Sequence, residues 1–93
     1  MNVNQYLAIV NFYSVEKGGR KTTLNNINFR PILIFDNLNF HCQISIGKNE
    51  IIKPGDKLVL SISVLDSCIM KQGDIFYLKE LNIIAEGQII KCL

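Results

Sequence analysis

A basic cluster around a pair of glycines is the part of the sequence best suited to binding an anion. Four cations lie within fourteen residues: Lys17, Arg20, Lys21 and Arg30. Glu16 is the only acidic residue beside them, and Gly18-Gly19 lies between the first two. A guanidinium donates two parallel hydrogen bonds to a phosphate or carboxylate, and glycine lets an anion approach exposed backbone N–H groups. The cluster predicts contact with an anion or a protein partner, and a solvated surface turn is the alternative.

Residues for catalysis or metal binding are scarce. The chain has one histidine, His41, and its three cysteines are widely spaced: Cys42, Cys68 and Cys92. No CxxC pair or zinc-ligand spacing is present, and no nucleophile or carboxylate lies near His41 in the pattern of a triad. The phosphate-binding pattern Gly-x-x-x-x-Gly-Lys-Ser/Thr is also missing. We expect no enzymatic activity, no metal, no cofactor and no bound nucleotide, with the cysteines as reduced, buried thiols.

Composition limits the class of protein. A chain of 93 residues with 48% apolar and 19% charged residues is expected to form one globular domain over residues 1–93. The net charge of +2 does not by itself imply a polyanionic partner. Neither an apolar run of membrane-spanning length nor a signal peptide is recognised. The sequence therefore predicts a cytoplasmic protein, and its richness in Ile, Asn and Lys suggests a bacterial source.

Alternating apolar and polar residues predict β-strands. The alternation is clearest in Asn39–Ile46 and Lys57–Leu65, and the fifteen isoleucines of the chain suit a pleated surface. The inward sets of these two strands give the predicted core: Phe40, Cys42, Ile44, Leu58, Leu60, Ile62 and Val64. Further strands are expected at Tyr6–Tyr13, Ile32–Phe35, Ile75–Lys79 and Ile83–Cys92, with a short one at Glu50–Lys53.

Turn signals separate these strands. The clearest are Asp36-Asn37, Pro54-Gly55-Asp56 and Gln72-Gly73-Asp74. In the second of them, Pro fixes φ, Gly takes a positive φ and Asp hydrogen-bonds back to the backbone, which explains the residues structurally. Many short strands at near-regular spacing indicate a closed barrel or a sandwich.

Six motifs follow one another from about Leu7 to the end of the chain. They are Phe12-Tyr13, Lys17-Gly18-Gly19-Arg20-x-Thr22, Phe29-Arg30-Pro31, Pro54-Gly55-Asp56, Met70-Lys71-Gln72-Gly73 and Phe76-Tyr77-Leu78-Lys79-Glu80. In this order they resemble the C-terminal (third) β-barrel domain of translation elongation factor Tu. The resemblance implies an all-β fold, a closed six-stranded antiparallel barrel, here without the GTPase domain that the third domain packs against in the full factor.

The resemblance also implies a site. In that family a Gly-Gly-Arg turn and an Arg-Glu-Gly-Gly turn contact tRNA. The first turn is matched here, whereas in the second Lys79-Glu80 stands for Arg-Glu and Leu81-Asn82 replaces the glycines, so that a Leu side chain obstructs a phosphate. The candidate binding residues are Lys17, Gly18, Gly19, Arg20, Lys21, Thr22, Arg30, Lys79 and Glu80.

Two functions follow as hypotheses. The first is a non-catalytic binding module that engages an unidentified protein partner as a mimic, decoy or immunity-like protein. The alternative is weak tRNA or RNA binding, centred on Arg20. Lys79 and Glu80 are expected to form a surface ion pair.

Five aromatic residues exceed what a barrel of this size readily buries: Tyr6, Phe12, Tyr13, Phe29 and Tyr77. Aromatic side chains left on the outside would favour protein contact, and the alternative is that they fill the ends of the barrel. The sequence leaves both open.

Overall fold

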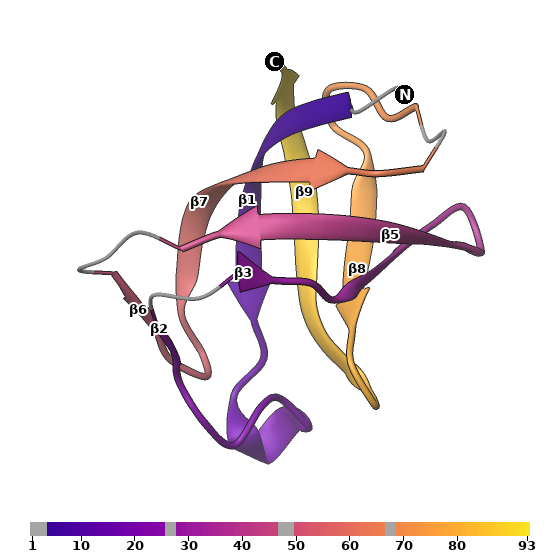
Figure 1. The fold of residues 1–93 in the computed structure, drawn as a ribbon. Coiled ribbons are helices and arrows are strands. Elements are labelled where there is room, and N and C mark those ends of the chain that lie inside the picture. The colour runs from indigo at the N-terminus through magenta and orange to yellow at the C-terminus, as the bar shows by residue number, and fades with distance from the viewer. Residues whose placement is uncertain (1–3, 26–27, 47–49, 67–68) are drawn as a thin grey trace.

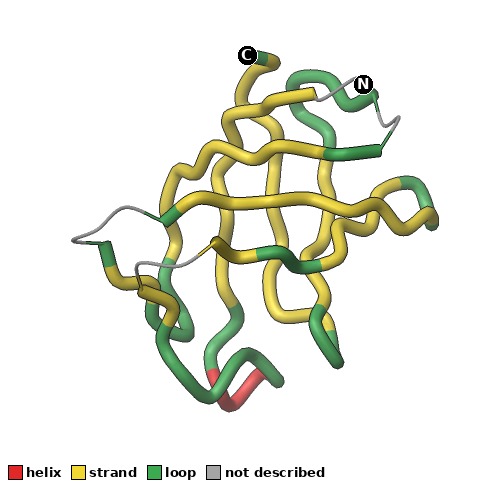
Figure 2. Tube along the Cα trace, viewed as in Figure 1, coloured by secondary structure: helices red, strands yellow, loops and turns green. Residues whose placement is uncertain are grey.

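A computed structural model describes residues 4–25, 28–46, 50–66 and 69–93 of the chain. Within these ranges the elements are β1 (Asn4–Phe12), η1 (Val15–Lys17), β2 (Leu24–Asn25), β3 (Asn28–Phe29), β4 (Ile32–Phe35), β5 (Leu38–Ser45), β6 (Ile51–Ile52), β7 (Lys57–Val64), β8 (Ile75–Lys79) and β9 (Ile83–Cys92). Figure 2 shows strands throughout, with a single 3-10 turn, η1. None of the described residues forms a helix long and apolar enough to cross a membrane.

Six strands close into an antiparallel barrel. The sheet runs β5-β4-β8-β9-β1-β7, and β7 pairs back with β5. In Figure 1, β5 and β7 cross over β1, β9 and β8 at a steep angle. The predicted closed six-stranded antiparallel barrel is confirmed. Three predicted strands have the observed bounds, the others differ by one or two residues at their ends, and the two-residue strands β2 and β3 were not predicted.

The closing pair of strands is short and is lengthened by a side chain. β5 and β7 share three register pairs, from Cys42–Val64 to Ile44–Ile62. Beyond them the Leu65 N–H donates to the His41 carbonyl at 2.9 Å. The His41 N–H then donates to Asp66 Oδ2 at 2.6 Å, and the same oxygen lies 3.0 Å from His41 Nδ1. Asp66 therefore extends the ladder that closes the barrel.

β3 and β4 are two parts of one interrupted strand. Both pair with β5 in a continuous register, because Phe29 lies opposite Ile44 and Ile32 lies opposite His41. Pro31 lies in the gap and has no N–H to donate. Its carbonyl instead accepts a hydrogen bond from the buried thiol of Cys42 at 3.4 Å.

The cysteines differ from one another. Cys42 is a free, buried thiol, as the sequence predicts, and burial raises its pKa to about 12, so it stays protonated at neutral pH. The expectation of burial is wrong for Cys92, which is exposed because it is the last residue of β9, at the end of the barrel wall. Its thiol donates to the Met70 carbonyl at 3.4 Å. Cys68 lies outside the described residues.

The predicted core is largely confirmed. Five of its members are buried: Cys42, Ile44, Leu60, Ile62 and Val64. Phe40 and Leu58 are half-buried and pack against the core, because they lie towards the turn-proximal ends of β5 and β7. The other strands contribute further buried apolar side chains, among them Ala8, Val10, Phe76, Leu78, Ala85 and Ile89.

Phe76 fills space that Gly87 leaves open. The two residues are register partners on β8 and β9, and Phe76 is fully buried. A Cβ at position 87 would lie 2.1 Å from Cζ of the Phe76 ring. The ring therefore packs directly on the glycine backbone, and any larger residue at position 87 would displace it.

The predicted turns form as the residue types require. Two turns repeat one pattern, Lys53–Asp56 and Lys71–Asp74. In each, the Asp N–H donates to the Lys carbonyl at 3.0 Å while the Asp carboxylate accepts the Lys N–H at 2.8 or 2.9 Å. Their glycines have φ near +90°. Asp36 and Asn37, both with positive φ, form the tight turn between β4 and β5.

The aromatic residues divide between the two alternatives. Tyr6, Phe12 and Phe29 are buried, and the Tyr6 hydroxyl accepts a hydrogen bond from the Met70 N–H at 3.0 Å. Tyr13 and Tyr77 are half-buried on the outer surface. Three of the five aromatic side chains are therefore part of the buried core, and the other two are available for contacts at the surface.

Substituting Leu60 or Ile62 with Ala tests the core. Each change removes buried apolar groups and leaves a cavity, so we expect the free energy of unfolding to fall by about 2–5 kcal/mol. Urea unfolding monitored by circular dichroism measures the loss. Ser61→Ala, an exposed position between the two, is the matched control. Unchanged unfolding midpoints in Leu60→Ala and Ile62→Ala would show that the register of β7 is wrong.

Asp66 makes the closure of the barrel sensitive to acid. The His41 backbone hydrogen bond, followed by its side chain, lowers the pKa of Asp66. A carboxylate with a lowered folded-state pKa contributes stability above its unfolded pKa of about 3.9, and that stability is lost as the pH falls through the folded value. We expect Asp66→Asn to be less stable than wild type at neutral pH and to lose less stability on acidification.

The measurement is a series of urea unfolding curves from neutral to strongly acidic pH. Asp36→Asn removes the same charge from the β4–β5 turn and serves as the control. Parallel pH profiles for wild type and Asp66→Asn would contradict the role of Asp66.

Candidate functional site

The glycine turn uses its own N–H groups. After η1, the Gly18 N–H donates to the Val15 carbonyl at 3.1 Å, and the Gly19 N–H donates to the Ser14 carbonyl at 2.9 Å. Gly18 has φ of 90° and caps the 3-10 turn. The prediction that these N–H groups are exposed to an anion is therefore wrong. The chain bends back on itself here, and both donors satisfy carbonyls of that bend.

Gly19 is required by a close contact. A Cβ at this position would lie 2.0 Å from the Tyr13 carbonyl oxygen. Only glycine lets the chain return so tightly over the end of β1. The contact explains Gly19 structurally, without reference to a ligand.

Arg20 is held by three partners. Its Nη1 donates to Glu80 Oε1 and Oε2 at 2.6 and 2.5 Å, and its Nη2 donates to Thr22 Oγ1 at 3.1 Å. The guanidinium carbon lies 5.8 Å from the centroid of the Phe29 ring, in cation–π contact. Nε is buried and has no hydrogen-bond acceptor. Only 23% of the Arg20 side chain is exposed, so its neighbours cover most of its surface.

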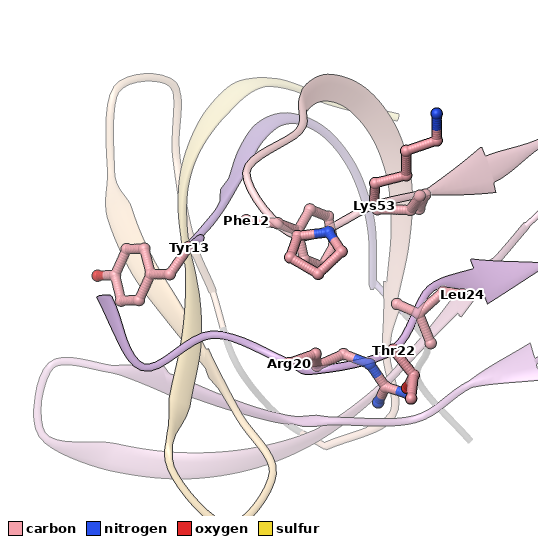
Figure 3. Close-up of a pocket in the computed structure, with 8 residues that line it drawn as sticks. Phe12, Tyr13, Arg20, Thr22, Leu24 and Lys53 are labelled. Carbon is pink, nitrogen blue, oxygen red and sulfur yellow. The ribbon is translucent and has the colours of Figure 1, made fainter. Parts of the chain in front are cut away.

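The surroundings of Arg20 are tightly packed. Phe29 contacts Phe12, with ring centroids 6.4 Å apart. Figure 3 shows Arg20 and Thr22 beside Leu24, with Phe12 facing them and Tyr13 turned away. The cavity between these side chains has a volume of about 10 Å³, which is about the minimum needed to hold one water molecule. It is too small for a substrate or cofactor.

Glu80 pairs across the fold and not with its neighbour. The prediction of a Lys79–Glu80 pair is wrong, because consecutive residues at the end of a strand point to opposite sides. Glu80 instead reaches Arg20, sixty positions away. Its N–H donates to the Asn82 carbonyl at 3.0 Å, which fixes the turn between β8 and β9. Both side chains are partly exposed, so the pair contributes about 0–1 kcal/mol to stability.

A groove of about 300 Å³ separates the two turns. Its lining residues are Gly18, Gly19, Arg20, Glu80, Leu81, Asn82 and Ile84. Leu81 lies at the tip of the β8–β9 turn with 93% of its surface exposed. The sequence predicts Leu81 only as an obstacle to phosphate. Its place in a turn that usually holds Gly, Asn or Asp was the available signal that this leucine is displayed at the surface.

The structure gathers some of the predicted residues and separates others. Gly18, Gly19, Arg20 and Glu80 line the groove, and Thr22 supports Arg20. Lys17 and Lys21 are exposed next to them in the chain, and Lys79 is half-buried. Arg30 is exposed between β3 and β4, outside the groove lining.

The flanking cations form no ion pair among the described residues. There the close contacts between basic and acidic side chains are the Arg20–Glu80 ion pair and the His41–Asp66 contact. Lys17, Lys21, Lys79 and Arg30 have no carboxylate at ion-pair distance within that part of the chain. Lys17 and Lys21 adjoin the glycine turn in the chain and Lys79 adjoins Glu80, so three of these cations lie next to groove residues in the sequence.

No protein-family model matches the chain, and no curated protein matches it. The resemblance to the third domain of elongation factor Tu therefore stays a prediction. It rests on the motifs of the sequence and is compatible with the closed six-stranded barrel.

His41 and Tyr13 are titratable side chains outside the groove. His41 is exposed, as predicted, but the expectation that no carboxylate is positioned beside it is wrong. Barrel closure brings it Asp66, which accepts a hydrogen bond from the His41 backbone N–H and lies 3.0 Å from Nδ1. Partial burial, followed by Glu86 and Tyr77, raises the pKa of Tyr13, so its phenol is neutral at pH 7. Among the described residues no cluster of three His, Cys, Asp or Glu side chains could hold a metal ion.

Gly19→Ala tests the close contact in the glycine turn. The added Cβ must push the Tyr13 carbonyl or the loop aside, so we expect a loss of about 1–3 kcal/mol in the free energy of unfolding. Gly18→Asn is the control, because its position has open space and asparagine tolerates a positive φ. Urea unfolding compares them. Equal stability of Gly19→Ala and wild type would contradict the geometry of the turn.

Proposed function

We propose that the chain is a non-catalytic protein-binding module, and that its contact face is the groove between the glycine turn and the β8–β9 turn. The observation that carries the proposal is the exposure of Leu81 beside a concave surface of about 300 Å³. An exposed aliphatic side chain beside a concave surface offers apolar area that a protein partner can remove from water. The donors that would hold a phosphate are already engaged, which weakens the nucleic-acid alternative.

Leu81 supplies the energy of the proposed contact. Fully burying a leucine side chain against a partner contributes about 1.5–3 kcal/mol. The Glu80–Asn82 backbone hydrogen bond fixes the turn that carries it, so little conformational freedom is lost on binding. The groove would receive an apolar side chain of the partner between Leu81 and the glycine backbone.

We propose further that the partner is a protein that recognises the third domain of elongation factor Tu. The motifs of the sequence and the closed six-stranded barrel support this mimicry. A chain with that shape acts as a decoy or immunity-like protein when it occupies the partner in place of the factor. The proposal places this activity in the bacterial cytoplasm, where translation factors work.

Photo-crosslinking tests the contact face. A photoreactive phenylalanine replaces Leu81 and, in a separate control, Val59, which is 51% exposed on β7 and does not line the groove. We expect a discrete protein adduct from position 81 alone, with less adduct when elongation factor Tu is added in excess. Identical adducts from both positions would contradict the proposed face, and an adduct that the factor leaves unchanged would contradict mimicry.

The alternative is weak tRNA binding, which the unpaired Lys17, Lys21 and Lys79 favour. Because Arg20 is engaged by Glu80, we expect such binding to be confined to low salt and to be nearly unaffected by Arg20→Ala. Titration of labelled aminoacyl-tRNA at low and physiological salt measures it. Tight binding at physiological salt would replace the protein-binding proposal with the RNA-binding one.

A further inference from the structure

Arg20 and Glu80 both line the groove of the proposed binding module, and their pairing affects which ligands can bind there. We infer that Glu80 is a specificity-determining residue: its carboxylate occupies the anion site of Arg20 and thereby excludes RNA phosphate from the basic face around the glycine turn. The inference goes beyond the proposed function, and its test needs no protein partner.

The hydrogen-bond donors of Arg20 leave no forked site for an external anion. Both hydrogen bonds of Nη1 go to the Glu80 carboxylate, and Nη2 donates to Thr22. Nε, which together with Nη2 could hold a phosphate bidentately, is buried. The guanidinium carbon lies 5.8 Å from the centroid of the Phe29 ring, in cation–π contact. A phosphate can therefore reach a pair of donors only by displacing Glu80.

Displacing Glu80 is unfavourable for a free ligand. The carboxylate is tethered to the same molecule, and tethering gives an effective concentration of about millimolar or higher. The hydrogen bond from the Glu80 N–H to the Asn82 carbonyl holds the turn in place, so the carboxylate is presented ready to bind. A phosphate that enters merely exchanges one charge-assisted interaction for another. The incoming ligand gains little and must also desolvate.

The remaining cations attract RNA without holding it. Lys17, Lys21 and Lys79 are compact point charges on flexible stems and lack the planar fork of arginine. They raise the local concentration of any anion but fix no orientation. Leu81 projects beside the same groove, where a hydrated phosphate gains nothing from it. The face thus keeps long-range attraction for acidic surfaces while discriminating against nucleic acid.

Releasing Arg20 should create RNA binding. The probe is a short labelled uridine oligonucleotide, and binding is followed by fluorescence anisotropy across a salt series. Glu80→Gln is compared with Glu16→Gln, which removes the same charge from the neighbouring 3-10 turn without touching Arg20. We expect Glu80→Gln to bind about tenfold more tightly than Glu16→Gln at low salt. Its salt slope should be steeper by about 0.7, the value for one additional phosphate contact.

The double variant Arg20→Ala/Glu80→Gln decides the origin of any gain. It should return to the affinity of Glu16→Gln, because the released fork is then absent. Equal affinities for Glu80→Gln and Glu16→Gln would overturn the inference, since net charge alone would explain the change. A gain that survives Arg20→Ala would overturn it as well.

A measurement on the wild-type protein keeps the inference falsifiable if the variants fold poorly. Carboxylate-bound guanidinium groups rotate slowly, so NMR of the side-chain nitrogens should show hindered rotation at Arg20 and free rotation at the exposed Arg30. Equal rotation at both would overturn the inference. Crosslinking at Leu81 reports separately on the protein partner, so failure of the proposed function is distinguishable from failure of this one.

Discussion

Antiparallel pairing of β1 with β9 is the constraint on which the candidate site depends. The register places Phe12 opposite Ala85, and the Tyr13 N–H donates to the Ile84 carbonyl at 2.9 Å. The turn that follows β1 and the turn that precedes β9 must therefore emerge at the same end of the barrel. Barrel closure through β5 and β7 holds this pair of strands in the middle of a sheet without free edges. The groove is the space left between the two turns.

Within that groove, the Arg20–Glu80 ion pair has a small interaction energy but determines whether Arg20 is free to bind an anion. The Arg20–Glu80 pair adds little to stability because both side chains are partly exposed. The pair nevertheless neutralises the charge of Arg20, the residue of the sequence best suited to bind an anion, and Arg20 also contacts the Phe29 ring. The face that remains combines unpaired lysines with one displayed leucine. Stability and specificity are thus set by different interactions at the same place.

Local patterns were sufficient to predict the barrel, and long-range contacts were needed for the site. Alternation in β5 and β7 identified Ile44, Leu60 and Ile62 as core, since period two depends only on neighbouring residues. The turn at Pro54 likewise followed from residue types. The sequence predicted an ion pair between Glu80 and its neighbour Lys79. The observed partner, Arg20, is sixty positions away, and strand register brings the two together, which one sequence does not reveal.

The donors of the glycine turn were misjudged for a related reason. Exposure of the Gly18 and Gly19 N–H groups was inferred from composition, whereas a single 3-10 turn redirects them to Val15 and Ser14. Such a short helical turn leaves almost no periodic signal in a sequence. Phe29 beneath Arg20 was also not foreseen, because the strand that carries it is interrupted at Pro31 and only two residues long.

The packing of Phe76 on Gly87 limits the kinds of ligand that this barrel can serve. Barrels that transport small apolar molecules keep a hollow interior, with side chains withdrawn from the axis. Here the Phe76 ring lies directly on the backbone of the neighbouring strand β9, in a contact that excludes even one additional carbon at position 87. A retinoid- or fatty-acid-sized guest would have to expel that ring. For a ligand of that size, only the rim and the outer wall of the barrel are accessible.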